Sequence, residues 1–139
     1  MARDSLGMFE GWGAFRDPAV PRCYAIAVAE KGGGYADVGV WPRRHVRGQV
    51  HFRLSKVPQG KEAPRLVVGG RRFELLASGR DAWLSDGRAE AAVLAAMRSS
   101  AGMTVSARGG DGKLFTDSYR LVGAASAIDS ALVGCAGGG

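Results

Sequence analysis

Two cysteines and two histidines are the residues of this chain whose types suggest chemistry. Cys23 opens the apolar run CYAIAV, Cys135 lies near the other end, and His45 and His51 share one basic stretch. A thiol beside an imidazole can act as a nucleophile that the imidazole activates as a base. A catalytic dyad of Cys23 with His45 or His51 is therefore formally possible. No GxSxG elbow accompanies the serines, however, and the chain carries no recognisable catalytic signature.

Metal and cofactor sites have even less support in the sequence. A zinc site needs several Cys, His or carboxylate ligands at short, defined spacings, and neither C-x-x-C nor H-E-x-x-H occurs here. The glycine-rich stretches KGGGY and RGGDGK do not match a phosphate-binding loop, so they predict turns. We therefore expect no catalytic, metal-binding or cofactor-binding residues.

The cysteines admit two structural interpretations. An even count, with one member near each end of a domain, fits a single bridge, which would close a long loop and stabilise the fold by about 4–5 kcal/mol. Two unrelated buried thiols fit the count equally well. A bridge would persist only in an oxidising compartment, so the state of these cysteines bears on location.

Basic residues gather around one aromatic side chain. The net charge is +6, carried by 15 Arg against 4 Lys. Such a surface suits an anionic ligand, although a compositional bias or an ordinary solvated face explains it too. Trp41 ends an apolar run before Pro42, so we expect it to pack in the core or at a sheet edge. The candidate anionic-ligand surface comprises Arg43, Arg44, His45, Arg47, Arg53, Arg71 and Arg72.

The elements that must position these residues are mostly strands. In GQVHFRLS, Val50, Phe52 and Leu54 face one way while His51 and Arg53 face the other, which is the pattern of a half-buried antiparallel strand. Gly69-Gly70 and the segment 109–112 each indicate a hairpin. The prolines of the segment 57–65 predict a loop.

Two alanine-rich stretches depart from this alternation and predict short helices near 87–99 and 124–134, the first with Asp86 as its N-cap. Seven or eight strands with frequent turns then indicate a mainly β fold, an antiparallel β-sandwich or a small barrel, of which we favour the sandwich. We expect a single domain over 2–136 and a flexible glycine tail at 137–139.

The chain gives two alternatives for location. No apolar stretch approaches the roughly 18 residues of a transmembrane helix, and the first residues lack the pattern of a signal peptide. Either the protein is cytoplasmic, or it is periplasmic or secreted and a leader has been removed.

The order of three segments resembles the invasion-associated locus B family of exported α-proteobacterial proteins. The segments are FEGWGAFRD followed by PRCYAIAV, then AEAAVLAAMRSSAGMTVSA, then YRLVGAASAID. This resemblance implies an immunoglobulin-like β-sandwich in the bacterial envelope, a cleaved leader and a link to host-cell invasion. Family members often carry a cysteine near the position of Phe15-Arg16-Asp17, where this chain has none. A bridge of Cys23 would therefore join Cys135 or a second molecule.

Together these observations predict a non-catalytic, exported interaction protein. Its partner would be another protein or an anionic envelope polymer, with phosphate-bearing lipid among the candidates. One alternative is a small nucleic-acid-binding β-domain that uses the basic strand from Arg43 to Arg53, although we do not favour nucleic acid as the ligand. The other alternative is an uncharacterised hydrolase.

Overall fold

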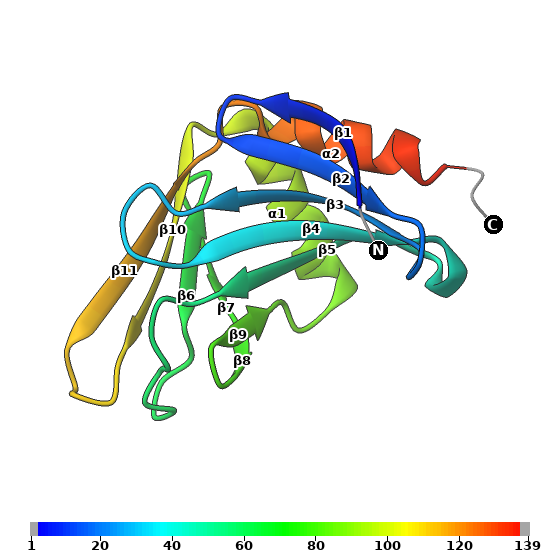
Figure 1. The fold of residues 1–139 in the computed structure, drawn as a ribbon. Coiled ribbons are helices and arrows are strands. Elements are labelled where there is room, and N and C mark those ends of the chain that lie inside the picture. The colour runs from blue at the N-terminus through cyan, green and yellow to red at the C-terminus, as the bar shows by residue number, and fades with distance from the viewer. Residues whose placement is uncertain (1–2, 137–139) are drawn as a thin grey trace.

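The computed structural model describes residues 3–136, so the expected glycine tail at 137–139 and the first residue of the expected domain lie outside the described residues. Within this range the chain forms two antiparallel sheets and two helices (Figure 1). The mainly β sandwich with two short helices is therefore confirmed. The described range holds eleven strands, more than the seven or eight expected, because several strands are too short to show an alternating pattern.

The larger sheet has seven strands in the order β1-β2-β3-β4-β5-β9-β8, the first five of them a meander. Its strands are β1 (Asp4–Phe9), β2 (Trp12–Asp17), β3 (Arg22–Val28), β4 (Tyr35–Trp41), β5 (Val46–Arg53), β8 (Leu76–Ser78) and β9 (Asp81–Trp83). A short 3-10 turn, η1 (Pro42–Arg44), connects β4 to β5. The alternation predicted for β5 is confirmed, since Val50 and Phe52 are fully buried and His51 and Arg53 are not.

The smaller sheet has four strands in the order β11-β10-β6-β7. They are β6 (Arg65–Val68), β7 (Arg71–Glu74), β10 (Gly102–Arg108) and β11 (Leu114–Arg120). Both predicted hairpins are confirmed here, as β6 pairs with β7 and β10 with β11. The Trp12 indole N–H of the larger sheet donates to the Arg120 carbonyl of the smaller one at 2.8 Å and ties the two sheets together.

The helices α1 (Gly87–Ser99) and α2 (Ala124–Gly134) match the predicted ranges. Asp86 caps α1 as expected, because its carboxylate accepts from the Ala89 N–H at 2.8 Å. Both helices cover the inner face of the larger sheet: α2 contacts β1 to β4, and α1 contacts β5 (Figure 1). No helix within residues 3–136 is long and apolar enough to cross a membrane.

The side chains of β3 decide how closely α2 approaches. The inward residues Cys23, Ala25 and Ala27 are small and buried, whereas Tyr24 and Ile26 alternate with them and point to the outer face. The buried face of α2 is small as well, with Ala124, Ala127 and Ala131 among its members. Small residues on both elements let the helix lie close against the strand.

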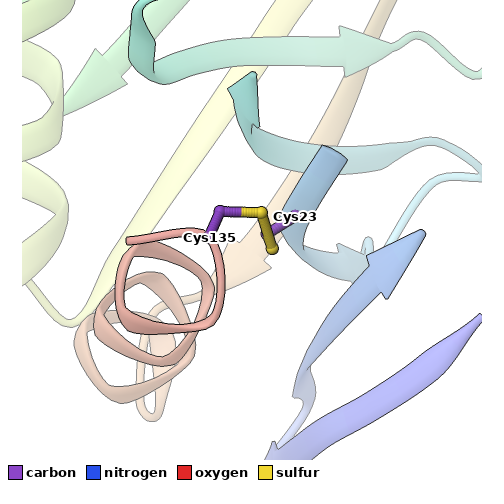
Figure 2. Close-up of a disulfide and its surroundings, with 2 residues drawn as sticks. All are labelled: Cys23 and Cys135. Carbon is purple, nitrogen blue, oxygen red and sulfur yellow. A yellow bond between two sulfur atoms is a disulfide. The ribbon is translucent and has the colours of Figure 1, made fainter. Parts of the chain in front are cut away.

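That close approach brings the two cysteines together. Cys23 on β3 and Cys135 at the end of α2 form a disulfide, with Cα atoms 5.9 Å apart (Figure 2). The intramolecular bridge is thus the correct interpretation of the cysteine pair. It also removes the thiol that a Cys23 dyad with His45 or His51 would require, so that alternative is wrong.

A buried carboxylate fixes the loops at one end of the larger sheet. Asp117 on β11 is fully buried and accepts from the Gly33 N–H at 3.3 Å and the Ser55 N–H at 2.9 Å. Gly33 precedes β4 and Ser55 follows β5. One side chain of the smaller sheet therefore holds the start of β4 and the end of β5 in place.

The disulfide predicts a large loss of stability on its removal. The variant Cys23→Ala/Cys135→Ala should lose about 2–5 kcal/mol of unfolding free energy in urea denaturation, since the unfolded chain is no longer cross-linked. Wild-type protein in reductant should behave like the double variant. Two free thiols, detected by alkylation and intact mass in oxidised protein, would contradict the bridge.

Asp117 predicts a graded series. Asp117→Ala leaves two backbone N–H groups without an acceptor and should cost about 2–4 kcal/mol in urea denaturation. Asp117→Asn keeps one acceptor oxygen and should cost less. Asp111→Ala is the matched control, because the Asp111 carboxylate also accepts a backbone N–H, from Lys113, but is exposed. Equal losses of stability in all three variants would show that burial of the Asp117 carboxylate does not strengthen its hydrogen bonds to the backbone.

Candidate ligand-binding site

The outer face of the larger sheet carries unusually large side chains. On β3, β4 and β9 the alternation directs small or aliphatic residues inward and the aromatic ones, together with Ile26 and Asp37, outward. Trp41 belongs to this outer set and is half-buried at the end of β4, so of the two places expected for it, the core and a sheet edge, the core is wrong. The outward aromatic residues of these strands are Tyr24, Tyr35, Trp41 and Trp83.

Strand register aligns these side chains with polar ones across the sheet. Asp37 pairs with Ile26 on one side and His51 on the other, and His51 pairs in turn with Trp83. The neighbouring row holds Tyr24, Gly39 and Gln49. Side chains in one row, or diagonal to each other, lie within reach of direct contact.

These residues line a groove of about 480 Å³ that crosses β3, β4, β5 and β9. This volume falls in the range of small-molecule sites, roughly 300–1,000 Å³. Gly39 forms part of its floor. A Cβ atom at this position would lie 2.9 Å from the Trp41 Nε1 atom and 3.6 Å from the Arg22 Nε atom, so glycine leaves the room that the Arg22 side chain occupies.

Arg22 is held between two aromatic rings above Gly39. Its guanidinium carbon lies 4.3 Å from the centroid of the Tyr24 ring and 4.8 Å from that of Trp41. Arg44 also lies over Trp41, at 4.9 Å. Cation–π contacts of this kind, at partly buried positions, fix a guanidinium that would otherwise sample many rotamers.

An ionic chain runs along the groove from Arg22. The Arg22 Nη2 atom donates to Asp37 at 3.2 Å, and His51 bonds Asp37 through Nδ1 at 2.8 Å and Asp81 through Nε2 at 2.9 Å. Arg53 closes the chain by donating to Asp81 at 3.1 Å. Asp37 is only 5% exposed, so this chain compensates a carboxylate that the sheet has largely desolvated.

The two carboxylates control the protonation of His51. The hydrogen bond to Asp37, followed by the one to Asp81, raises the pKa of the His51 imidazole, and burial opposes them only in part. The same contact with His51, helped by Arg53, lowers the pKa of Asp81. Protonated His51 donates from both ring nitrogens, so neither nitrogen is free to take a proton from a substrate.

One polar atom of this cluster has no partner. The Arg22 Nε atom is buried and makes no hydrogen bond with any residue in the range 3–136. A buried donor without an acceptor costs about 1–3 kcal/mol. An oxygen of a bound ligand or water molecule would relieve that cost.

The structure divides the arginine surface predicted from the sequence. Arg43 and Arg44 lie on η1, His45 follows in a left-handed conformation (φ 57°), and Arg47 and Arg53 lie on β5. Of these, Arg44 contacts the groove residue Trp41, and Arg53 contacts Asp81, which bonds the groove residue His51. Arg71 and Arg72 lie on β7 of the smaller sheet, where Arg71 covers Phe73.

Sequence reasoning missed Arg22, Tyr24, Asp37 and Trp83. The signal available was the alternation of CYAIAV, which separates a face of small side chains from a face of large ones but does not say which of the two lies outside. Across the described residues, no three His, Cys, Asp or Glu side chains are grouped as metal ligands.

The raised pKa of His51 predicts a pH-dependent contribution to stability. The pKa of His51 in the folded protein lies above 6.5, its value in the unfolded chain. The stability that protonated His51 contributes is therefore fully present below about pH 6.5 and is lost as the pH rises through the folded-state pKa. His51→Gln should therefore cost on the order of 1 kcal/mol at pH 5.5 and less at pH 9. An NMR titration of the His51 ring in wild-type protein, with a midpoint at or below 6.5, would refute this.

No family model, no curated protein and no solved structure matches this chain. The groove and its immobilised arginine are therefore the basis on which a function has to be proposed.

Proposed function

We propose that this chain is an exported, non-catalytic binding module that holds a negatively charged group of its ligand in the groove of the larger sheet. The observation that carries this proposal is Arg22, whose guanidinium is fixed between Tyr24 and Trp41 while 25% of its side chain stays exposed. Binding to a cation that is already ordered avoids most of the entropy cost of fixing a long side chain.

The charge around the groove supports an anionic ligand. Arg3 donates to the Tyr24 hydroxyl at 2.8 Å, and Arg22, Arg44 and Arg53 lie along the same face. Asp37 and Asp81 form ion pairs with two of these four arginines, Arg22 and Arg53, and protonated His51 adds a further positive charge. A cleft with an excess of one charge attracts ligands of the opposite charge.

Two features support binding over catalysis. Both nitrogens of His51 are engaged by carboxylates, and both cysteine sulfurs are in the disulfide. The groove thus lacks an available base next to a nucleophile, which hydrolysis by an activated Ser or Cys would need.

The disulfide supports an oxidising compartment, because such bridges are rare in the reducing cytosol. Together with the resemblance to the invasion-associated locus B family, this favours the periplasm or the cell exterior. A role in contact between the bacterial envelope and a host cell is part of the same proposal.

Heparin retention tests the anionic site. Arg22→Gln/Arg44→Gln should bind immobilised heparin about tenfold more weakly than wild type, equivalent to ~1.4 kcal/mol, and should elute at lower salt. Arg71→Gln/Arg72→Gln removes the same charge from the other sheet and should change binding less than twofold. Equal losses in both variants, or retention that salt does not weaken, would refute the proposal.

A further inference from the structure

The groove has two chemically different ends. At one end Arg22 and Arg44 cover the Trp41 ring, so this end presents guanidinium groups. At the other end lie Trp83 and Tyr35. The His51 ring packs edge-on against Tyr35, with ring centroids 6.0 Å apart, and no arginine lies over either ring among the residues described. A ligand that fills the groove therefore meets a positive charge and, beside it, an uncovered aromatic surface.

We infer that the ligand is a saccharide chain whose rings carry carboxylates, that is, an acidic polysaccharide of the uronic acid type. This inference rests on the proposed anionic site and specifies its ligand class. The sugar carboxylate pairs with Arg22, and the C–H face of a pyranose ring packs on Trp83 or Tyr35. Guanidinium and carboxylate are planar groups of matching geometry, and an aromatic ring supplies a large, flat apolar contact.

The polar groups between the two ends suit sugar hydroxyls. Gln49 lines the groove, is exposed and offers both a donor and an acceptor. Next to the groove, the Asp81 carboxylate retains acceptor capacity beyond its bonds to His51 and Arg53. Hydroxyl groups can donate to such a carboxylate and accept from the amide. A ligand of apolar rings alone would leave these groups unpaired, at a cost in affinity.

The space between the Tyr24 and Trp41 rings is not open to the bases of single-stranded nucleic acid. Base stacking needs free aromatic faces, and Arg22 already occupies this space. A saccharide does not have to insert a base between these two rings and avoids this conflict.

The probe for this inference is trigalacturonate, compared with its methyl ester and with neutral maltotriose. Calorimetric titration of wild-type protein should show the acid binding at least tenfold more tightly than the ester, and the neutral trisaccharide binding more weakly still. Arg22→Gln should remove the preference for the acid. Trp83→Ala should weaken the acid and the ester alike by about tenfold, whereas Phe73→Ala, on the other sheet, should change neither by more than twofold.

Amide chemical-shift mapping of wild-type protein with trigalacturonate tests the same site without any substitution. Its result therefore does not depend on whether the variants fold. Shifts should cluster on β3, β4, β5 and β9, and shifts confined to β7 or the helices would overturn the inference. Equal binding of acid and ester would overturn it as well. So would tighter groove binding of an oligothymidylate or of phosphatidylglycerol vesicles, although the anionic site would then stand. If Arg22→Gln/Arg44→Gln binds heparin as tightly as wild type does, the proposed function itself fails.

Discussion

The close contact between the small face of β3 and α2 is the constraint on which both the fold and the groove depend. Cys23, Ala25 and Ala27 let the helix approach until Cys23 and Cys135 can be joined. Because successive side chains of a strand point to opposite faces, this choice sends Tyr24 and Ile26 outward. One strand therefore determines where the chain is cross-linked and which face carries the aromatic residues.

The ion pairs of the outer face contribute little to stability by themselves. Surface ion pairs contribute about 0–1 kcal/mol each, and four of them are joined here through Asp37, His51 and Asp81 over a sheet that also carries aromatic rings. The Arg22 Nε atom is buried and unpaired among the described residues. In the proposed function, a bound anion would meet the exposed quarter of the Arg22 side chain, which the two rings and Asp37 already hold in place.

Local patterns in the sequence were sufficient for the helices, the hairpins and the alternation of β5, because each depends on neighbours along the chain. The orientation of CYAIAV could not be predicted in the same way, since both of its faces are apolar and only α2 decides between them. The pairing of Asp37 with His51, and of His51 with Asp81, depends on strand register across three strands. The three-residue strands β8 and β9 are too short to carry any periodic signal, so Trp83 had no predicted place on the groove.

Arginine content alone was a poor guide to the candidate site, and the reason lies in the surroundings of each side chain. Arg72 and Arg22 carry the same charge, but Arg72 is exposed on β7, whereas Arg22 lies between two rings and is anchored by Asp37. An exposed arginine must lose rotamer freedom when it binds, while one that is already fixed loses little. The arginine best suited to bind a ligand is therefore the one that aromatic neighbours have ordered, and such neighbours come together only when distant strands pair.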